Sequence, residues 1–263
     1  MKPVAIIGGT GFYEPGLLAD VSERIVATPY GMATVHTGSY AGTPLVFVAR
    51  HGADHSLPPH RVNYRANIWA LYEMGVQSVF ATAASGSLTP QIPPGSLCLC
   101  DQFLDFTRSR VSTFFEGGEW GVRHVDMTSP YCPRLRTVLA ASAAEEGIAL
   151  GTGATYVCTE GPRFETPAEI RAYAQLGGQL VGMTGVPEVV LAREAGMCYA
   201  SVAIATNSAA GLAGHPLTHA EVVEAMAAAV ARVRGLILRA AVAVADVNCT
   251  ECAGSLLPVR EGA

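Results

Sequence analysis

The chain has 263 residues, half of them apolar and only 15% charged, and its formal net charge is −5. A weakly acidic chain without a run of lysines or arginines argues against nucleic acid or an anionic membrane as its main partner. The N-terminus enters an apolar segment at Val4 without the long apolar core of a secretory signal, and no segment has the pattern of a membrane span. We therefore expect a cytoplasmic protein with enough apolar residues for a full-sized core.

Apolar segments typical of strands alternate along the chain with segments typical of helices. In chain order the pattern predicts strands at 4–7 and 45–49, a helix at 63–74, strands at 79–83 and 96–101, a helix at 134–146, a strand at 155–158, a helix at 167–176, a strand at 180–183, a helix at 187–195, a strand at 199–205 and a helix at 218–244. This alternation indicates an α/β fold with a parallel or mixed sheet covered on both faces. No linker or internal repeat divides the chain, so we expect a single domain at 1–245 and a C-terminal tail at 246–263.

Candidate anion-binding residues follow the ends of four predicted strands, where open α/β sheets usually bind ligands. They are Thr10 in the glycine-rich segment 8–11, Arg50 with His51, the small-residue turn at 81–87, and Thr184 before a predicted helix. Hydroxyls, a guanidinium, an imidazole and exposed backbone N–H groups all donate to an oxyanion. The first three also have another interpretation, namely a dinucleotide-binding turn (although Glu14 stands where its third glycine belongs), a surface ion pair and tight packing.

An aromatic residue, a carboxylate and a carboxamide stand where a purine can meet all three. Phe164 and Glu165 lie in the segment 159–166, and Asn207 follows the strand predicted at 199–205. A carboxylate accepts from the ring N1–H of a 6-oxopurine, and an amide donates to its O6 or N7. The alternative for Glu165 is an ordinary carboxylate at the start of a helix.

Seven cysteines are present, and four of them lie in apolar segments as expected of buried free thiols. Cys249 and Cys252 form a lone CxxC in the tail. No second pair is visible for a zinc site, and the strand-to-helix context of a thioredoxin motif is absent. A local disulfide and a metal half-site stay open as alternatives, but a tail that carries two thiols is favoured, and no metal is expected.

Several segments in order resemble the methylthioadenosine phosphorylase/purine nucleoside phosphorylase family, in its trimeric branch. They lie at 6–11, 50–52, 62–71, 101–105, 159–164 and 186–192, and the similarity runs from residue 4 to about residue 245. The resemblance implies a single α/β domain whose central mixed sheet has a barrel-like character and is flanked by helices. It also implies a homotrimer, or a homohexamer made of two trimers, and phosphorolysis of a purine nucleoside without metal or cofactor, with inorganic phosphate as co-substrate.

The family's site residues fall on matching positions of this chain. The resemblance implies a phosphate site formed by Thr10, Arg50, His51, Thr184 and the backbone of Ala83 and Ala84, and a nucleoside site formed by Phe164, Glu165, Met183, Asn207, Ser208 and Ala209. Asn207, His51 and Glu165 are the expected catalytic residues. His124 matches a segment that family members contribute to a neighbouring subunit's site.

Base preference is where the sequence departs from methylthioadenosine phosphorylases. That subgroup carries an acidic residue at the position of Asn207, another near Ala209, and a small polar residue at the position of Glu165. An adenine 6-amino group needs an acceptor, whereas a 6-oxo group needs the donor that Asn207 offers. The expected substrates are therefore inosine and guanosine, cleaved to free base and ribose 1-phosphate in purine salvage.

The 5′ group of the nucleoside is the second question of specificity. His219 matches the histidine that meets the 5′-hydroxyl in inosine and guanosine phosphorylases, so we favour these nucleosides. The alternative enzymes are an S-methyl-5′-thioinosine phosphorylase and, less favoured, a methylthioadenosine phosphorylase. The alternative for His219 is a solvated residue in the first turn of the helix. Outside this class stand a dinucleotide-binding oxidoreductase built on residues 8–11 and a catalytically idle nucleoside-binding protein.

Overall fold

The computed structural model describes residues 1–9, 12, 15–52, 54, 56–214, 218–244, 249, 251–252, 254 and 256–257. The strands are β1 (Val4–Gly8), β2 (Ala19–Thr28), β3 (Gly31–Tyr40), β4 (Thr43–Ala49), β5 (Ser78–Ser87), β6 (Leu97–Phe106), β7 (Leu150–Thr159), β8 (Leu180–Gly182) and β9 (Cys198–Ser208). The helices are α1 (Tyr64–Glu73), α2 (Pro133–Glu145), α3 (Pro167–Gln175), α4 (Glu188–Glu194) and α5 (His219–Val244), with short 3-10 helices at Pro15–Leu17, Pro59–Arg61 and Gly118–Trp120.

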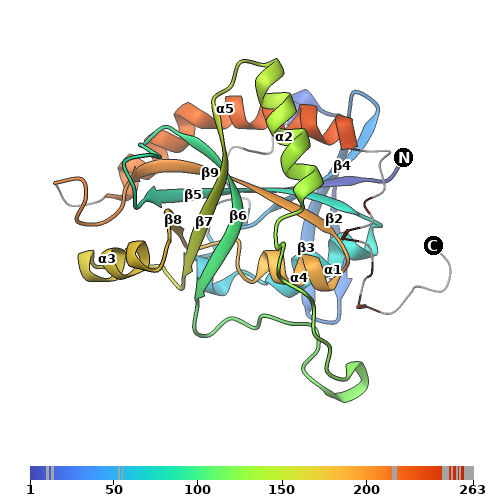
Figure 1. Ribbon diagram of the computed structural model, residues 1–263. Helices are drawn as coiled ribbons and strands as arrows, with labels where there is room; N and C mark the ends of the chain where they lie inside the picture. Colours follow the sequence, from blue (N-terminus) through green and yellow to red (C-terminus); the bar gives the residue numbers. More distant parts are fainter. Residues whose placement is uncertain are drawn as a thin grey trace.

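The strands form one mixed sheet that closes on itself at one end. Their order is β2-β3-β4-β1-β5-β8-β7-β6-β9, and β5 also pairs with β9. The strands β5, β8, β7, β6 and β9 therefore make a closed barrel, from which β1, β4, β3 and β2 extend as an open sheet (Figure 1). The fold is a single α/β domain with a barrel-like mixed sheet flanked by helices, as the resemblance implies.

Helices cover the sheet on both sides. In Figure 1, α2 and α5 lie above the strands and α1 and α4 lie below them. One apolar cluster joins Leu135 and Leu139 of α2 to Val233 and Leu236 of α5. A second cluster joins α1 and α4 to the opposite side of the sheet. Burial on both faces explains why β1, β4 and the first half of β5 are continuous apolar runs.

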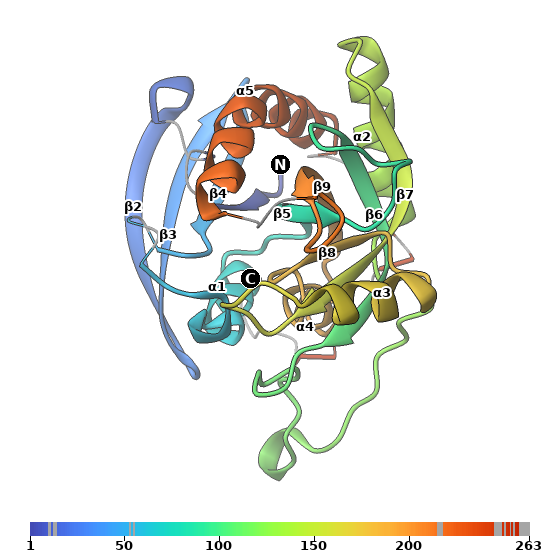
Figure 2. The ribbon, with the colours of Figure 1, turned by 90° about the vertical axis from the view of Figure 1, so that its left-hand side faces the viewer.

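The hairpin of β2 and β3 is absent from the elements that the sequence predicts. Figure 2 shows the two strands as a long curved ribbon at the outer side of the molecule. Almost every residue of β2 is exposed, and the strand pairs antiparallel with β3. A strand that faces solvent has no apolar run to mark it, so only its pairing with β3 defines it.

Local signals explain where the helices begin. Pro133 and Pro167 stand in the first turns of α2 and α3, where a missing backbone N–H costs nothing. Thr166 caps α3, because its hydroxyl accepts from the Glu169 N–H while the Glu169 carboxylate accepts from the Thr166 N–H. This capping box fixes the chain directly after Glu165.

A β-bulge at the end of β9 determines which way the side chains at this end of the strand point. β5 and β9 run parallel in register up to Ser85 and Ala205, but Gly86 then pairs with Asn207. Thr206 is thus an extra residue on β9. A bulge breaks the alternation of side chains along a strand, which allows two successive residues to point to the same side. Among the helices that the structure describes, none combines the length and apolar character that crossing a bilayer requires.

Candidate active site

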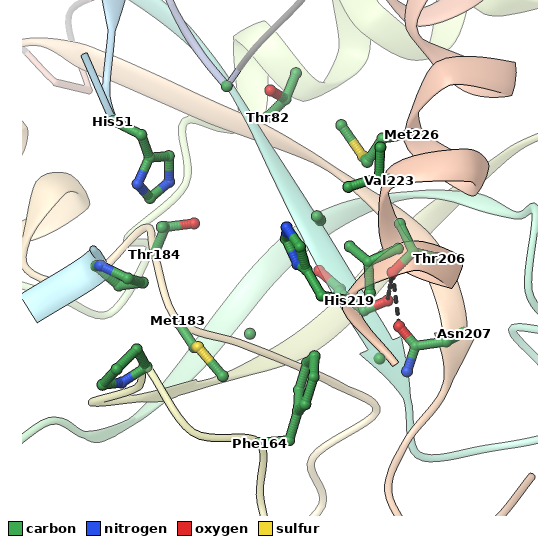
Figure 3. A pocket seen from close by; sticks show the side chains of 18 of the residues that line it. His51, Thr82, Phe164, Met183, Thr184, Thr206, Asn207, His219, Val223 and Met226 are labelled. Carbon is green, nitrogen blue, oxygen red and sulfur yellow. Dashed lines mark hydrogen bonds between the residues drawn. The ribbon is translucent and has the colours of Figure 1, made fainter. Parts of the chain in front are cut away.

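A cavity of about 850 Å³ opens beside the barrel strands β5 and β9. Ten of the predicted site residues line it: Arg50, His51, Ala84, Phe164, Glu165, Met183, Thr184, Asn207, Ala209 and His219. They come from segments far apart in the sequence. In Figure 3, His51 and Thr184 lie on one side of the cavity and Thr206 and Asn207 on the other, with Phe164 and Met183 along one edge.

Strand β5 spans the cavity between these two ends. Thr82 lies beside Arg50, and Gly86 pairs with Asn207 four residues further along the strand. At about 3.3 Å per residue, the two ends are roughly 13 Å apart. The cavity is therefore long enough for an oxyanion, a pentose and a purine side by side.

Arg50 is buried and held by a carboxylate that the sequence analysis did not identify. Its Nε and Nη2 donate to Glu188 at 2.7 Å each, and its Nη1 donates to the Thr82 carbonyl oxygen at 2.9 Å. Tyr199 donates its hydroxyl to the same carboxylate at 2.7 Å. Burial alone lowers the pKa of the guanidinium, but Glu188 outweighs this effect and leaves the pKa above its usual value.

This arrangement fixes Arg50 as a permanent cation at one end of the cavity. Three of the five guanidinium N–H groups are used by these bonds, so each Nη atom keeps one N–H for a further acceptor. The buried pair with Glu188 cancels most of the charge, and this reduces the cost of burying the guanidinium.

His51 and Thr184 lie together on one side of the cavity (Figure 3). The Nδ1 atom of His51 lies 2.8 Å from the Leu57 carbonyl oxygen, which only accepts, so Nδ1 carries a hydrogen. His51 lines the cavity in this orientation. The backbone N–H of Thr184 donates to the buried Tyr156 hydroxyl at 3.2 Å, which fixes the loop after β8. Gly9 lines the cavity here, whereas Thr10 lies outside the described residues.

Asn207 has an amide whose orientation the surrounding bonds determine. One terminal atom of the amide lies 2.8 Å from the Ser208 carbonyl oxygen and must therefore be the nitrogen. The other accepts from the Thr206 hydroxyl at 2.7 Å. The Nδ2 atom thus keeps one N–H, which makes Asn207 a hydrogen-bond donor at this end of the cavity.

Glu165 is a buried carboxylate in the same cavity. It is 9% exposed, and the Thr159 hydroxyl donates to its Oε1 at 2.6 Å. Burial raises the pKa of Glu165 above its usual value, against the opposing effect of the Thr159 hydrogen bond. A carboxylate with little solvent and one hydroxyl partner still has lone pairs for an N–H donor.

Arg110 ties together the two loops that carry Glu165 and Thr184. Its side chain is 2% exposed. Its Nη2 donates to the carbonyl oxygens of Thr159, Glu160 and Met183, and its Nη1 donates to that of Val186 at 2.6 Å. The planar guanidinium group of Arg110 therefore fixes the distance between the segments at the ends of β7 and β8.

Helix α5 forms one wall of the cavity. His219, its first residue, is exposed and lines the cavity. The remaining wall is apolar and consists of Val222, Val223, Met226, Ala227 and Val230. An imidazole at the rim of an apolar wall is compatible with either a hydroxyl or an apolar group on the ligand.

Three residues named in the sequence analysis do not line the cavity. The side chain of Ala83 packs into the core, because successive residues of a strand alternate between faces and Ala84 takes the cavity side. Ser208 contributes only its backbone carbonyl, which orients Asn207. His124 is exposed and does not line its own chain's cavity.

Sequence reasoning missed several residues that shape the site. Glu188 and Arg110 lie outside every motif named above, whereas Thr82, Thr159 and Thr206 lie in or beside those motifs but were given no role of their own. Thr159 begins the segment that carries Glu165, and Thr206 directly precedes Asn207. Their closeness in sequence to these two residues is the signal that could have identified them. Nothing in the sequence marks Glu188 as the partner of Arg50, because 138 residues separate them.

Comparison with known proteins shows the family to which the chain belongs. A family model described as the phosphorylase superfamily matches residues 3–243. A probable 6-oxopurine nucleoside phosphorylase of Moorella thermoacetica is 52% identical over 256 residues, which are 96% of this chain and 98% of that protein. A probable S-methyl-5′-thioinosine phosphorylase of Methanopyrus kandleri is 50% identical over 225 residues, which are 85% of this chain and 86% of that protein.

A solved structure shows the same fold. Methylthioadenosine phosphorylase from Schistosoma mansoni, in complex with adenine, has a TM-score of 0.89 at 34% identity, and the match covers 96% of this chain and 95% of that chain. The family model and the relatives each extend over most of the sequence. The chain belongs to the phosphorylase superfamily.

Proposed function

We propose that the chain is a 6-oxopurine nucleoside phosphorylase, which cleaves inosine and guanosine with phosphate. The observation that carries this proposal is the fixed orientation of Asn207, whose Nδ2 is a donor in the same cavity as the Glu165 carboxylate. A donor for O6 or N7 and an acceptor for N1–H match a 6-oxopurine and mismatch adenine. Relatives that bear the corresponding name support the assignment.

The reaction follows from the two ends of the cavity. Phosphate, held by Arg50, His51 and Thr184, attacks C1′ of the ribose while the bond from C1′ to N9 breaks. The electron pair of that bond leaves with the purine, and Asn207 stabilises the charge by donating to N7 or O6. Glu165 holds N1–H and so orients the base. The products are the free base and ribose 1-phosphate, and no covalent bond to the enzyme forms.

The direct test is phosphate-dependent release of base from inosine, guanosine, adenosine and methylthioinosine, measured side by side. We expect rapid cleavage of inosine and guanosine and none of adenosine. Adenosine as the preferred substrate would contradict the roles of Glu165 and Asn207. No phosphorolysis of any of the four, with hypoxanthine still bound, would identify an idle binding protein.

Replacing Asn207 by Asp examines the donor itself. The carboxylate removes the N–H and faces the Ser208 carbonyl oxygen, so kcat for inosine should fall by about 10²-fold or more. Asn67→Asp is the matched control, because Asn67 lies on α1 and does not line the cavity. Equal inosine kinetics in the two variants would contradict the assigned donor.

A second candidate function, S-methyl-5′-thioinosine phosphorylase, is favoured by the apolar wall of α5 beside His219. Such a wall suits a thiomethyl group, and a relative of that name covers most of the chain. His219→Val should shift the ratio of kcat/KM toward methylthioinosine, because the unpaired imidazole costs about 1–3 kcal/mol against an apolar group. His36→Val on β3 is the control, and an unchanged ratio would place the 5′ pocket elsewhere.

We also propose that the chain forms a homotrimer, alone or paired as a hexamer. The segment between β6 and α2 projects from the body of the molecule and carries exposed His124 and Val122, the latter 71% exposed (Figure 1). A projecting segment with these residues is suited to reach a neighbouring subunit's cavity. Purine salvage in the cytoplasm is the proposed setting.

A further inference from the structure

Four cysteines gather outside the active-site cavity. They are Cys132, Cys198, Cys249 and Cys252, and their Sγ atoms all lie within 4.8 Å of one another. The Sγ atoms of Cys132 and Cys249 are 3.9 Å apart. None of the four lines the cavity. The CxxC of the tail, which lacks a partner pair in the sequence, therefore acquires one in the fold.

The backbone holds the first two sulfurs in place. Cys132 is the N-cap of α2, and its N–H donates to the Tyr199 carbonyl oxygen at 2.8 Å. Cys198 opens β9, and its N–H donates to the Gln77 carbonyl oxygen at 2.8 Å. The start of a helix and the start of a strand thus present two thiols side by side, independently of the tail.

The distances suit a metal ion rather than two disulfides. Tetrahedral zinc with a zinc–sulfur bond of about 2.3 Å places its sulfurs about 3.8 Å apart, close to the spacing between Cys132 and Cys249. A disulfide needs sulfurs at about 2.05 Å, and each of the four is a free cysteine in the structure. Four sulfur donors in this arrangement select zinc among common divalent ions, with iron as the competitor.

The surroundings favour a closed structural site. Cys132, Cys198 and Cys252 are buried and Cys249 is half-buried, within the apolar cluster of α2, α5 and β9. Four protein ligands leave no open position on a tetrahedral ion, which is typical of structural rather than catalytic zinc.

We propose that Cys132, Cys198, Cys249 and Cys252 bind one zinc ion, which fastens the C-terminal tail to α2 and β9. Binding displaces the thiol protons to solvent, and four thiolates coordinate the ion without any change in oxidation state. The tail is also anchored beyond the site, where the Leu256 N–H donates to the Glu194 carbonyl oxygen at 2.9 Å and Leu257 is buried. Together, the ion and these contacts hold the tail against the rest of the domain.

The first experiment measures metal and thiols on the purified full chain. Elemental analysis should find one zinc per chain after exhaustive dialysis without added metal. Thiol titration in denaturant with a chelator and no reductant should find all seven cysteines reactive. Three reactive thiols would indicate two disulfides and overturn the proposal, as would seven thiols without metal. Iron in the place of zinc would overturn the identity of the ion.

Variants connect the ion to these four residues. The double variant Cys249→Ser/Cys252→Ser should lose the zinc and unfold at a lower Tm, whereas Cys98→Ala, a buried cysteine outside the cluster, should keep one zinc per chain. Cobalt added to the metal-free wild type should give the visible absorption of a tetrahedral cobalt thiolate, and the double variant should not. Zinc retained in the double variant would contradict the ligand set. These readouts are independent of nucleoside cleavage.

Discussion

At the scale of single residues, the site includes a carboxylate held in an environment that disfavours its charge. Burial raises the pKa of Glu165, and the Thr159 hydroxyl compensates only in part. Because the pKa in the folded chain exceeds that in the unfolded chain, protonated Glu165 contributes stability at pH values below the ordinary carboxyl range. This contribution is lost as the pH rises through the raised pKa. The ionised carboxylate, for which we propose recognition of N1–H, is therefore destabilising in the empty enzyme.

Glu165→Gln separates recognition from stability. At neutral pH the variant should have a higher Tm than the parent, and the difference should vanish near pH 4, where the parent's carboxyl is protonated. Its kcat/KM for inosine should fall roughly 10- to 100-fold, because a hydrogen bond to a charged acceptor is lost. Calorimetry and steady-state kinetics measure both, with Glu224→Gln on α5 as the control. A lower Tm at neutral pH would contradict the cost assigned to the charge.

At the scale of elements, the site depends on loops that follow strands rather than on the strands alone. The loop after β7 carries Glu165 and the loop after β8 carries Thr184, and Arg110 donates to backbone carbonyl oxygens of both segments. A planar guanidinium can serve several acceptors at fixed angles, which a lysine ammonium cannot. One side chain therefore joins the two loops that carry the proposed base and phosphate subsites.

Arg110→Lys should loosen both loops together. Several buried carbonyl oxygens lose their donor, so we expect a loss of about 3 kcal/mol in the free energy of unfolding. The KM values for nucleoside and for phosphate should both rise, because each loop carries residues of a different subsite. Denaturant unfolding and two-substrate kinetics test this. Arg108→Lys is the control, because Arg108 is an exposed arginine two positions away in the sequence. A rise in only one KM would mean that the two loops are positioned independently.

At the scale of the whole molecule, the proposed trimer makes each site the product of two chains. His124 lies on the projecting segment and away from its own cavity, whereas Asn207 and Glu165 line the cavity of their own chain. Variants at these two kinds of position should therefore differ in their ability to complement one another within a mixed oligomer.

Co-expression of a His124→Ala chain with an Asn207→Ala chain tests that difference. His124→Ala alone should raise the KM for nucleoside, and mixed oligomers should contain some sites with both residues intact, so activity should exceed the average of the two parents. Asn207→Ala combined with Glu165→Gln is the control, because both residues lie in one chain's cavity and no intact site can form. Equal behaviour of the two mixtures would show that His124 serves no neighbouring site.

The sequence by itself determined the fold class, the helices and seven of the strands, because buried strands and amphipathic helices carry their burial in their residue pattern. Strand ends and adjacent motifs also pointed to seven of the residues that line the cavity, and the family resemblance implied three more, which are Met183, Ala209 and His219. It did not identify β2, whose mostly exposed residues carry no apolar run, or β3, which pairs antiparallel with β2.

Only the tertiary structure decided which distant groups meet. The bulge at Thr206 orients Asn207, and Glu188 holds Arg50 across 138 positions of the sequence. Cys132 and Cys198 join the tail's CxxC for the same reason, because a helix start and a strand start become neighbours only when the sheet has formed. Local residue patterns report burial and turn chemistry, whereas long-range partners are fixed by strand order and register, which no single segment encodes.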